Sequence, residues 1–163
     1  MERAHSMSLS RTQPRFRTES THAIDPKGRI IIPVRFRQVL EAYKSEGVFV
    51  TRLDKALVAY PYEKWYEIED RILSRPETSD ELRRFRRFFI GAAAECPLDK
   101  QGRILIPPEL RNYAQLEKDI SLVGVTDHFE IWNKQRRVDE DREMQEVDMK
   151  KEEVKSEIAK LGL

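Results

Sequence analysis

Two matching groups of charged residues are the most chemically informative feature of this 163-residue chain. The pattern Asp-x-x-Gly-Arg occurs twice, 74 residues apart, first at Asp25, Gly28 and Arg29 and then at Asp99, Gly102 and Arg103. An Arg guanidinium binds phosphate oxygens through paired hydrogen bonds, and it also fits the O6 and N7 edge of guanine. Lys27 and Lys100 lie in the same segments and would add charge near a phosphate backbone. These residue types predict a surface that binds nucleic acid.

The same two motifs also allow a purely structural interpretation. An Asp side chain can accept hydrogen bonds from its own turn or from the Arg four positions later, which fixes the loop. The Asp and the Arg would then stabilise a turn and do nothing more. The second copy does not decide between the two interpretations, because a repeated fold also repeats its structural pairs.

Each motif lies within a longer repeat. Residues 24–37 and 98–111 are identical at seven of their fourteen positions. Two copies are too few for a solenoid, so the repeat predicts two small modules of one kind that pack against each other.

The repeat also predicts the elements that position the motifs. Asp-x-x-Gly is a turn pattern, because glycine accepts a positive φ angle without a Cβ clash. The apolar run that follows predicts a buried strand at 30–32 and at 104–106, and the next proline opens a short helix. Each copy then predicts a hairpin and a helix, and the hairpin turns fall at Asp54-Lys55 and Asp127-His128. Three or four short strands do not close a core alone, so the modules must pair.

Between the modules, the sequence predicts a linker at 74–77 and a helix from Leu82 to about Ala93, with a capping box formed by Thr78 and Glu81. Four apolar residues share one face of this helix: Leu82, Phe85, Phe88 and Phe89. Four basic residues fill the other face: Arg83, Arg84, Arg86 and Arg87. Basic residues among aromatic ones can bind nucleic acid. This spacing instead favours a Phe face in the core and an Arg face that meets water or acidic side chains.

Charge is unevenly distributed, although the net charge is only +1. Residues 1–66 carry 12 basic and 7 acidic side chains, whereas residues 139–163 carry 5 and 9. The acidic tail has Val147, Val154 and Leu161 at heptad spacing, which predicts a helix that docks on the protein itself or on a neighbour. The polar composition of residues 1–15 predicts an irregular tail, which is either disordered or not part of the natural protein.

Composition argues against several classes of protein. No stretch approaches the roughly 20 apolar residues of a membrane span, and no secretory signal is visible, so we expect a cytoplasmic protein without a membrane partner. Cys96 is the single cysteine, which leaves no internal disulfide and no cysteine-based metal site. We expect Cys96 to be a small buried hydrophobe.

Catalysis has little support in the sequence. Asp25 and Asp99 could act as an acid and base pair, but a neighbouring Arg would keep each of them ionised. The three His residues show no metal-ligand spacing, and no Gly-rich phosphate loop follows a strand. We therefore expect no enzyme, no metal site, no cofactor and no small-molecule substrate.

Two longer segments resemble a known family. Phe16-Arg17 with residues 22–33 is similar to the opening of MraZ proteins, and residues 86–107 are similar to their middle. The resemblance covers about residues 16–138 and implies an α+β fold. In this fold two tandem AbrB-like (SpoVT-AbrB) swapped-hairpin half-barrels form an internal pseudo-dimer with flanking helices. The implied parts are module 1 at 19–66, a linker and helix at 67–94, module 2 at 95–138 and an acidic C-terminal helix at 139–163.

The resemblance also implies a function. MraZ proteins are bacterial transcriptional regulators that act on the nucleoid, at the promoter of the division and cell-wall gene cluster. They bind short direct repeats in double-stranded DNA and form rings, commonly octamers. The resemblance implies DNA contact by Arg29 and its counterpart Arg103, with support from Lys27, Lys100 and Arg17. A different class stays open, because AbrB-like folds also serve as protein–protein modules in antitoxins.

This chain departs from the family pattern at two places. Fifteen residues precede Phe16, where members usually begin, and if native they would cover or extend the basic face. Thr18 stands where the family usually has Gly, which would change the N-terminal turn.

Overall fold

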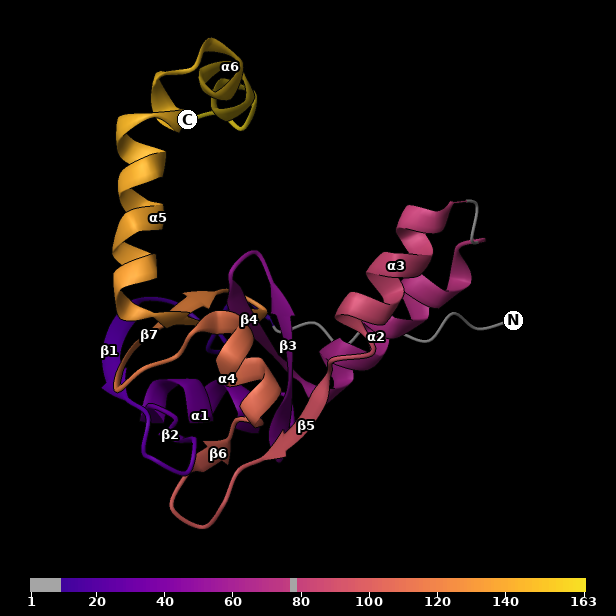
Figure 1. The fold of residues 1–163 in the computed structure, drawn as a ribbon, viewed down its shortest axis with the longest axis vertical. Coiled ribbons are helices and arrows are strands. Elements are labelled where there is room, and N and C mark those ends of the chain that lie inside the picture. Colours follow the sequence, from indigo (N-terminus) through magenta and orange to yellow (C-terminus); the bar gives the residue numbers. More distant parts are fainter. Residues whose placement is uncertain (1–9, 77–78) are drawn as a thin grey trace.

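The structure, a computed structural model, describes residues 10–76 and 79–163. A six-stranded antiparallel sheet and a two-stranded ribbon carry the helices around them (Figure 1). The first copy of the repeat contributes β1 (Glu19–Ala23), β2 (Arg29–Ile31), α1 (Val34–Ala42), β3 (Gly47–Leu53), β4 (Ala56–Pro61) and α2 (Tyr62–Ser74). After α3 (Asp80–Phe89), the second copy contributes β5 (Ala94–Pro97), β6 (Arg103–Leu105), α4 (Pro108–Ala114), β7 (Asp119–Val125), β8 (His128–Asn133) and α5 (Lys134–Glu146). The chain ends with the 3-10 turn η1 (Asp148–Lys150) and α6 (Glu152–Lys160).

The two copies exchange their strands. The sheet order is β1-β7-β8-β4-β3-β5, so the first strand of each copy pairs with the hairpin of the other copy. The last hairpin strands, β4 and β8, meet at the centre, and β2 pairs with β6 in the separate ribbon. This interleaving confirms the predicted α+β fold of two tandem swapped-hairpin modules.

Neither β1 nor β5 is predicted from the sequence, yet both strands form the edges of the sheet. Just before β1, Thr18 has a φ angle of 71°, a left-handed conformation that favours glycine.

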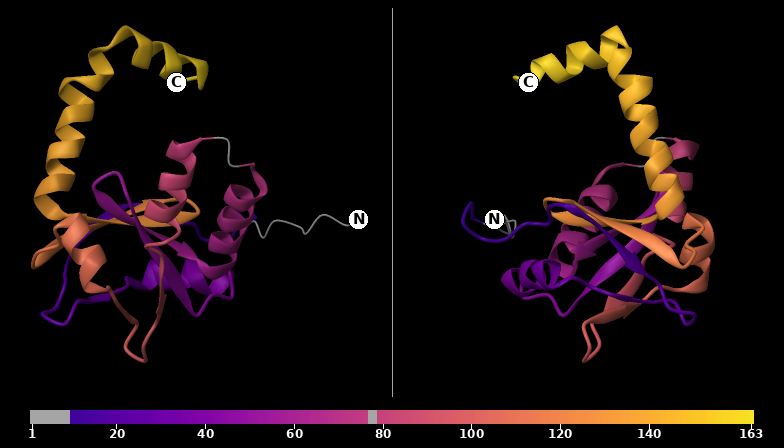
Figure 2. Two further views of the ribbon diagram at one scale, coloured as in Figure 1. Left: turned by 45° about the vertical axis from the view of Figure 1, so that its right-hand side comes forward. Right: turned by 90° about the vertical axis from the view of Figure 1, so that its left-hand side faces the viewer.

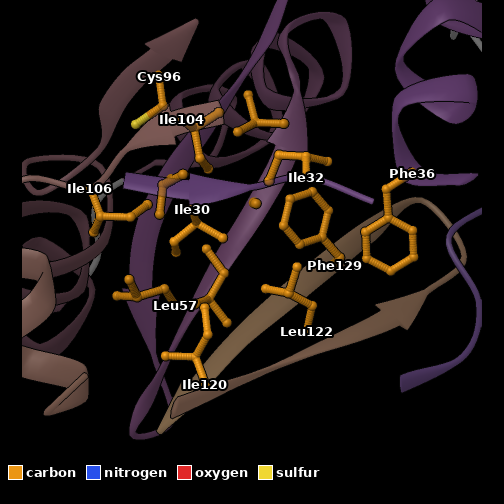
Figure 3. Packing of buried hydrophobic residues seen from close by; sticks show 14 of the residues in the cluster. Ile30, Ile32, Phe36, Leu57, Cys96, Ile104, Ile106, Ile120, Leu122 and Phe129 are labelled. Atoms are coloured by element: carbon orange, nitrogen blue, oxygen red, sulfur yellow. The ribbon is translucent and has the colours of Figure 1, made fainter. Parts of the chain in front are cut away.

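The core lies where the two copies meet. Ile30 and Ile32 of the first copy, and Ile104 and Ile106 of the second, are at most 1% exposed (Figure 3). A triangle of aromatic rings lies beside them, with centroids 5.1–5.3 Å apart: Phe16, Phe36 and Phe129. Burial of each such side chain stabilises the fold by about 1.5–3 kcal/mol, so the shared core holds the modules together.

The hairpin turns use left-handed residues. Asp54 and Lys55 have φ angles of 49° and 73°, as a two-residue hairpin turn requires, which confirms the turn predicted there. The second turn lies one residue earlier than predicted. Thr126 has a φ of 58°, and His128 already belongs to β8.

Helix α3 differs from its prediction at both ends. Ser79 is the N-cap, since its Oγ accepts a hydrogen bond from the backbone N–H of Leu82 at 3.2 Å; the predicted cap, Thr78, falls outside the described residues. The helix ends at Phe89 because the chain must turn to pair β5 with β3. Phe89 is buried against Trp65 of α2, but Leu82 and Phe85 are 46% and 38% exposed. The Phe face is thus only partly core.

The Arg face of α3 makes local contacts, as its favoured interpretation expects. Arg83 pairs with Asp80, and the Nη2 of Arg84 lies 3.8 Å from a Glu81 carboxylate oxygen. Arg86 Nη2 donates to the backbone carbonyls of Ile72 and Arg75, which ties α3 to the end of α2.

The acidic tail forms two helices rather than the single one predicted. The extended backbone of Lys151, with a ψ angle of 133°, separates η1 from α6, so the heptad spacing is not carried by one helix. Val147 and Leu161 are 42% and 75% exposed. Figures 1 and 2 show α6 held away from the sheet at the far end of α5. Docking on the chain's own body is therefore wrong for the residues described, and docking on a neighbour stays a prediction.

Among residues 10–76 and 79–163, no helix is long and apolar enough to cross a membrane.

Buried and exposed side chains alternate along β2, which predicts very unequal effects of truncating two adjacent residues. Ile30→Ala empties a fully buried position and should lower the free energy of unfolding by roughly 2–5 kcal/mol. Ile31→Ala changes a side chain that is 58% exposed and should shift the same quantity by less than about 0.5 kcal/mol. Urea unfolding of both variants measures the difference, and equal losses would contradict this register.

Candidate nucleic-acid interface

The first Asp-x-x-Gly-Arg motif is a closed set of hydrogen bonds, which we call a turn lock. Asp25 Oδ1 accepts from the backbone N–H groups of Lys27 at 3.0 Å and Arg29 at 2.8 Å. Asp25 Oδ2 accepts from Arg29 Nε at 2.6 Å. Gly28 has a φ of 93°, which allows its N–H to reach the carbonyl oxygen of Asp25 at 2.9 Å.

The second motif repeats the turn lock. Asp99 Oδ1 accepts from the backbone N–H groups of Gln101 and Arg103, both at 2.9 Å. Asp99 Oδ2 accepts from Arg103 Nε at 2.7 Å, and Gly102 has a φ of 76°. The structural interpretation of the motifs therefore holds as far as the turns are concerned.

The turn locks leave most of each guanidinium unused. Within the described residues, the Nε bond to Asp is the one hydrogen bond that the Arg29 guanidinium makes, and the same is true of Arg103. The Nη1 and Nη2 groups of both residues remain as donors. Their side chains are 32% and 24% exposed, so ligand atoms can reach them. The two interpretations are compatible, since one edge of the fork fixes the turn and the other faces outward.

The same hydrogen bonds keep the two carboxylates ionised. The pKa of Asp25 is lowered first by the backbone N–H of Arg29 and then by its side chain. The pKa of Asp99 is lowered in the same way by Arg103. A general acid near neutral pH needs the opposite shift, so the geometry does not favour an acid and base pair here.

The β2–β6 ribbon brings the two Arg residues together. In the antiparallel register, Arg29 lies opposite Leu105 and Arg103 lies opposite Ile31. Side chains two apart share a face, so all four point outward while Ile30 and Ile104 enter the core. The two Arg residues form a diagonal pair with Cα atoms about 7–8 Å apart. We call this set the outer ribbon face: Arg29, Ile31, Arg103 and Leu105.

Figure 1 shows β2 and β6 side by side at one end of the molecule, next to the turns that carry the motifs. Lys27 and Lys100 are exposed in these turns. Arg29 and Arg103 therefore share one surface, and Lys27 and Lys100 lie in the turns that lead into its two strands.

Arg17 does not join this surface. It is exposed but precedes β1, next to Phe16, which bridges Thr126 at the β7–β8 turn. Asp25 follows the other end of the same strand. Seven residues separate Arg17 from Asp25, and five of them form β1, which alone spans roughly 15 Å. Sequence proximity gave no sign of this distance, because the strand between them is not predicted.

Two functional candidates were missed although they are identical in both copies of the repeat. Arg111 lies against Gly28 of the other copy, and a methyl group added at Gly28 would be 2.8 Å from its Cζ. Arg37 lies against Gly102 in the same way, with a methyl-to-Nη1 distance of 3.0 Å. Each copy therefore supports the turn lock of the other. The sequence did contain a sign of this role, because Arg37 and Arg111 are identical at the last position of the repeat.

Cys96 does not offer a competing site. Cys96 is 2% exposed, and burial raises the pKa of its thiol to about 12, as expected for a buried hydrophobe. Across residues 10–76 and 79–163, no group of three His, Cys, Asp or Glu side chains could hold a metal ion.

The turn locks predict a specific titration. The depressed pKa values mean that both carboxylates stabilise the fold above the unfolded pKa, and that this stabilisation is lost as the pH falls through the folded value. Carboxyl carbon NMR should give midpoints below 3.8 for Asp25 and Asp99. Arg29→Ala should raise the Asp25 midpoint only part of the way, since the backbone N–H remains, and leave Asp99 unchanged. A midpoint of 3.8 or higher in the wild type contradicts the lock.

Gly28→Ala tests the contact between the copies. The added methyl group meets Arg111, and the φ of 93° is unfavourable for alanine, so the free energy of unfolding should fall by roughly 1–3 kcal/mol. Gly162→Ala is the matched control, because its φ is 84° but nothing lies within 4 Å. Thermal unfolding should separate the two variants. Similar melting temperatures would mean that the contact between Gly28 and Arg111 does not affect stability.

Comparison with known proteins agrees with the geometry. The model of the family described as "MraZ protein, putative antitoxin-like" matches residues 16–88 and again residues 89–154. A protein named Transcriptional regulator MraZ from Desulforapulum autotrophicum is 54% identical over 148 residues, which cover 91% of this chain and 99% of the relative. Proteins of the same name are 48% identical over 148 residues in Desulfosudis oleivorans, with the same coverage, and 47% identical over 122 residues in Syntrophobacter fumaroxidans, covering 75% of this chain and 81% of the relative. Each family match contains one turn lock, and the chain belongs to the MraZ family.

Proposed function

We propose that this protein is a sequence-specific DNA-binding transcriptional regulator without catalytic activity. The observation that carries the proposal is the outer ribbon face, where two fixed Arg side chains keep free Nη donors on one exposed surface. Lys27 and Lys100 add charge in the adjoining turns. The names of the relatives, which are transcriptional regulators, agree with this assignment.

The turn locks hold the guanidinium groups in place before a ligand binds. A free Arg side chain loses rotamer freedom when it binds, and that loss weakens affinity. Here Asp25 and Asp99 hold the guanidinium groups before DNA arrives. The free Nη groups would bind guanine edges or phosphate oxygens, and the lysines would bind phosphates as point charges. Binding of one protomer is then weak and depends strongly on salt concentration.

Affinity would come from repetition. A net charge of +1 gives little general attraction to DNA, so a single protomer must rely on a few local contacts. In our proposal, protomers assemble into a ring, commonly an octamer in this family, and several bind short direct repeats together. Effective concentration raises affinity by about 10² to 10⁴ without new contacts. The site would be the promoter of the division and cell-wall gene cluster, on the nucleoid in the cytoplasm.

A protein–protein module is the second candidate. The α2–α3 pair exposes three large apolar side chains: Leu73 at 58%, Leu82 at 46% and Phe85 at 38%. Exposed apolar side chains that lie together can mark a site for a protein partner. The family description as antitoxin-like agrees with such a role. A partner held by this apolar surface would bind almost independently of salt, whereas DNA binding should weaken steeply as salt rises.

Arg29→Ala is the direct test of DNA binding. Loss of one bidentate contact should weaken binding to the chain's own upstream region by roughly 5- to 150-fold. The oligomer mass and the melting temperature should change little, because Arg29 is partly exposed. Arg84→Ala removes the same charge from an exposed helix face and should bind like the wild type. Fluorescence anisotropy at several salt concentrations measures these affinities.

Unchanged binding by Arg29→Ala and by Arg103→Ala would mean that the turn locks are structural only. A second experiment deletes the upstream repeats one at a time and measures the affinity of the wild type for each DNA. A graded loss of affinity supports joint binding by several protomers, and indifference to repeat number removes that part of the proposal.

A further inference from the structure

The outer ribbon face exposes two large apolar side chains that the fold does not use. Ile31 and Leu105 are 58% and 56% exposed, although the residues before them in each strand, Ile30 and Ile104, are buried. They occupy equivalent positions in the two copies of the repeat. An exposed strand face usually carries polar residues, so the same exception in both copies points to a ligand rather than to the fold.

Each apolar residue directly faces an Arg of the other copy. Leu105 lies opposite Arg29, and Ile31 lies opposite Arg103, as neighbours across the ribbon. Directly opposite side chains have Cβ atoms about 4.5–5.5 Å apart. The outer ribbon face therefore alternates a guanidinium with an aliphatic group along each strand and directly across the ribbon. Its ligand must offer hydrogen-bond acceptors and apolar groups at the same short spacing.

The major groove of DNA offers that combination. Guanine presents O6 and N7 as acceptors for Arg, and thymine presents its C5 methyl group for apolar contact. A two-stranded ribbon is also narrow enough to enter this groove. Phosphates alone would not select aliphatic side chains, and the positive charge of Arg29, Arg103, Lys27 and Lys100 favours a polyanion over an apolar protein partner.

We infer that Ile31 and Leu105 are specificity-determining residues that contact thymine methyl groups in the major groove. The inference rests on the proposed function, and it adds the bases that the ribbon selects. Each Arg and the apolar residue opposite would contact neighbouring base pairs, so a preferred site carries thymine beside guanine.

Another explanation of the exposed side chains must be separated from this one. Leu105 and Ile31 could serve only to cover the aliphatic stems of Arg29 and Arg103. Their truncation would then weaken binding through the Arg residues, whichever bases are present. A change in the DNA that removes only the methyl group distinguishes the two explanations.

The experiment compares thymine with uracil, which lacks only the C5 methyl group. Duplexes of the chain's own upstream region are made with either base and titrated with the full-length wild type. Each lost methyl contact should weaken binding by about three- to fivefold, from the value of one buried carbon group. The double variant Ile31→Ala, Leu105→Ala should bind the thymine duplex more weakly and should not distinguish the two duplexes. Val125→Ala, at an exposed position on β7, should behave like the wild type.

Two results would overturn the inference while the proposed function survives. One is a wild type that binds its repeats specifically and equally well with thymine or uracil. The other is a double variant that keeps the full preference for thymine, because the preference would then come from DNA shape. A wild type that binds neither duplex overturns both proposals. Melting temperatures control for folding, since both substitutions are at exposed positions.

Discussion

Ile32 donates its backbone N–H to the carbonyl oxygen of Gly102, and Ile106 donates to that of Gly28, both at 2.9 Å. These reciprocal bonds extend the β2–β6 ribbon and join the two copies at the position where each carries its charged motif. Neither copy has enough strand to bury its own apolar residues, so this pairing is a condition for folding and not an addition to it. The ribbon is thus both part of the core and the outermost surface of the molecule. Its inner face holds the isoleucines, and its outer face holds the Arg pair.

The chemistry of arginine allows one motif to stabilise a turn and still present free donors at the surface. A guanidinium has five N–H donors in a fixed fork, and the turn lock takes one of them, at Nε. The remaining donors are oriented by the same bond. Lysine could not replace arginine in this arrangement, because an ammonium group has no second edge to present. Glycine at the turn is equally constrained, since the opposite copy's arginine occupies the space that a Cβ would need.

Local order along the chain explains which elements could be predicted. The strands predicted at 30–32 and 104–106, the short helices after the prolines and both hairpins followed from apolar runs bounded by turn residues. The two strands begin and end one residue earlier than predicted, at Arg29–Ile31 and Arg103–Leu105, and Ile31 and Leu105 are exposed rather than buried. The edge strands did not follow from such runs, because β1 consists of Glu, Ser, Thr, His and Ala and is held by pairing with β7 of the other copy. Strand β1 also separates Arg17, which the resemblance had placed with the DNA-contact residues, from the turn locks. The C-terminal segment was predicted as one helix, but the extended backbone of Lys151, the residue that interrupts the heptad positions, divides it into two.

The sequence alone determined that two like modules exist, that each has an Asp-x-x-Gly-Arg turn, and that its arginine either stabilises that turn or binds an anion. These conclusions depend on short local patterns and on their recurrence 74 residues later. Only the tertiary structure showed that the arginine stabilises the turn through Nε and keeps its other donors free, that Arg37 and Arg111 support the turns of the opposite copy, and that Ile31 and Leu105 face outward beside the arginines. Those facts depend on strand register between segments 74 residues apart. A shift of one residue in that register would exchange the buried and exposed faces of the ribbon, and nothing local to either segment fixes it.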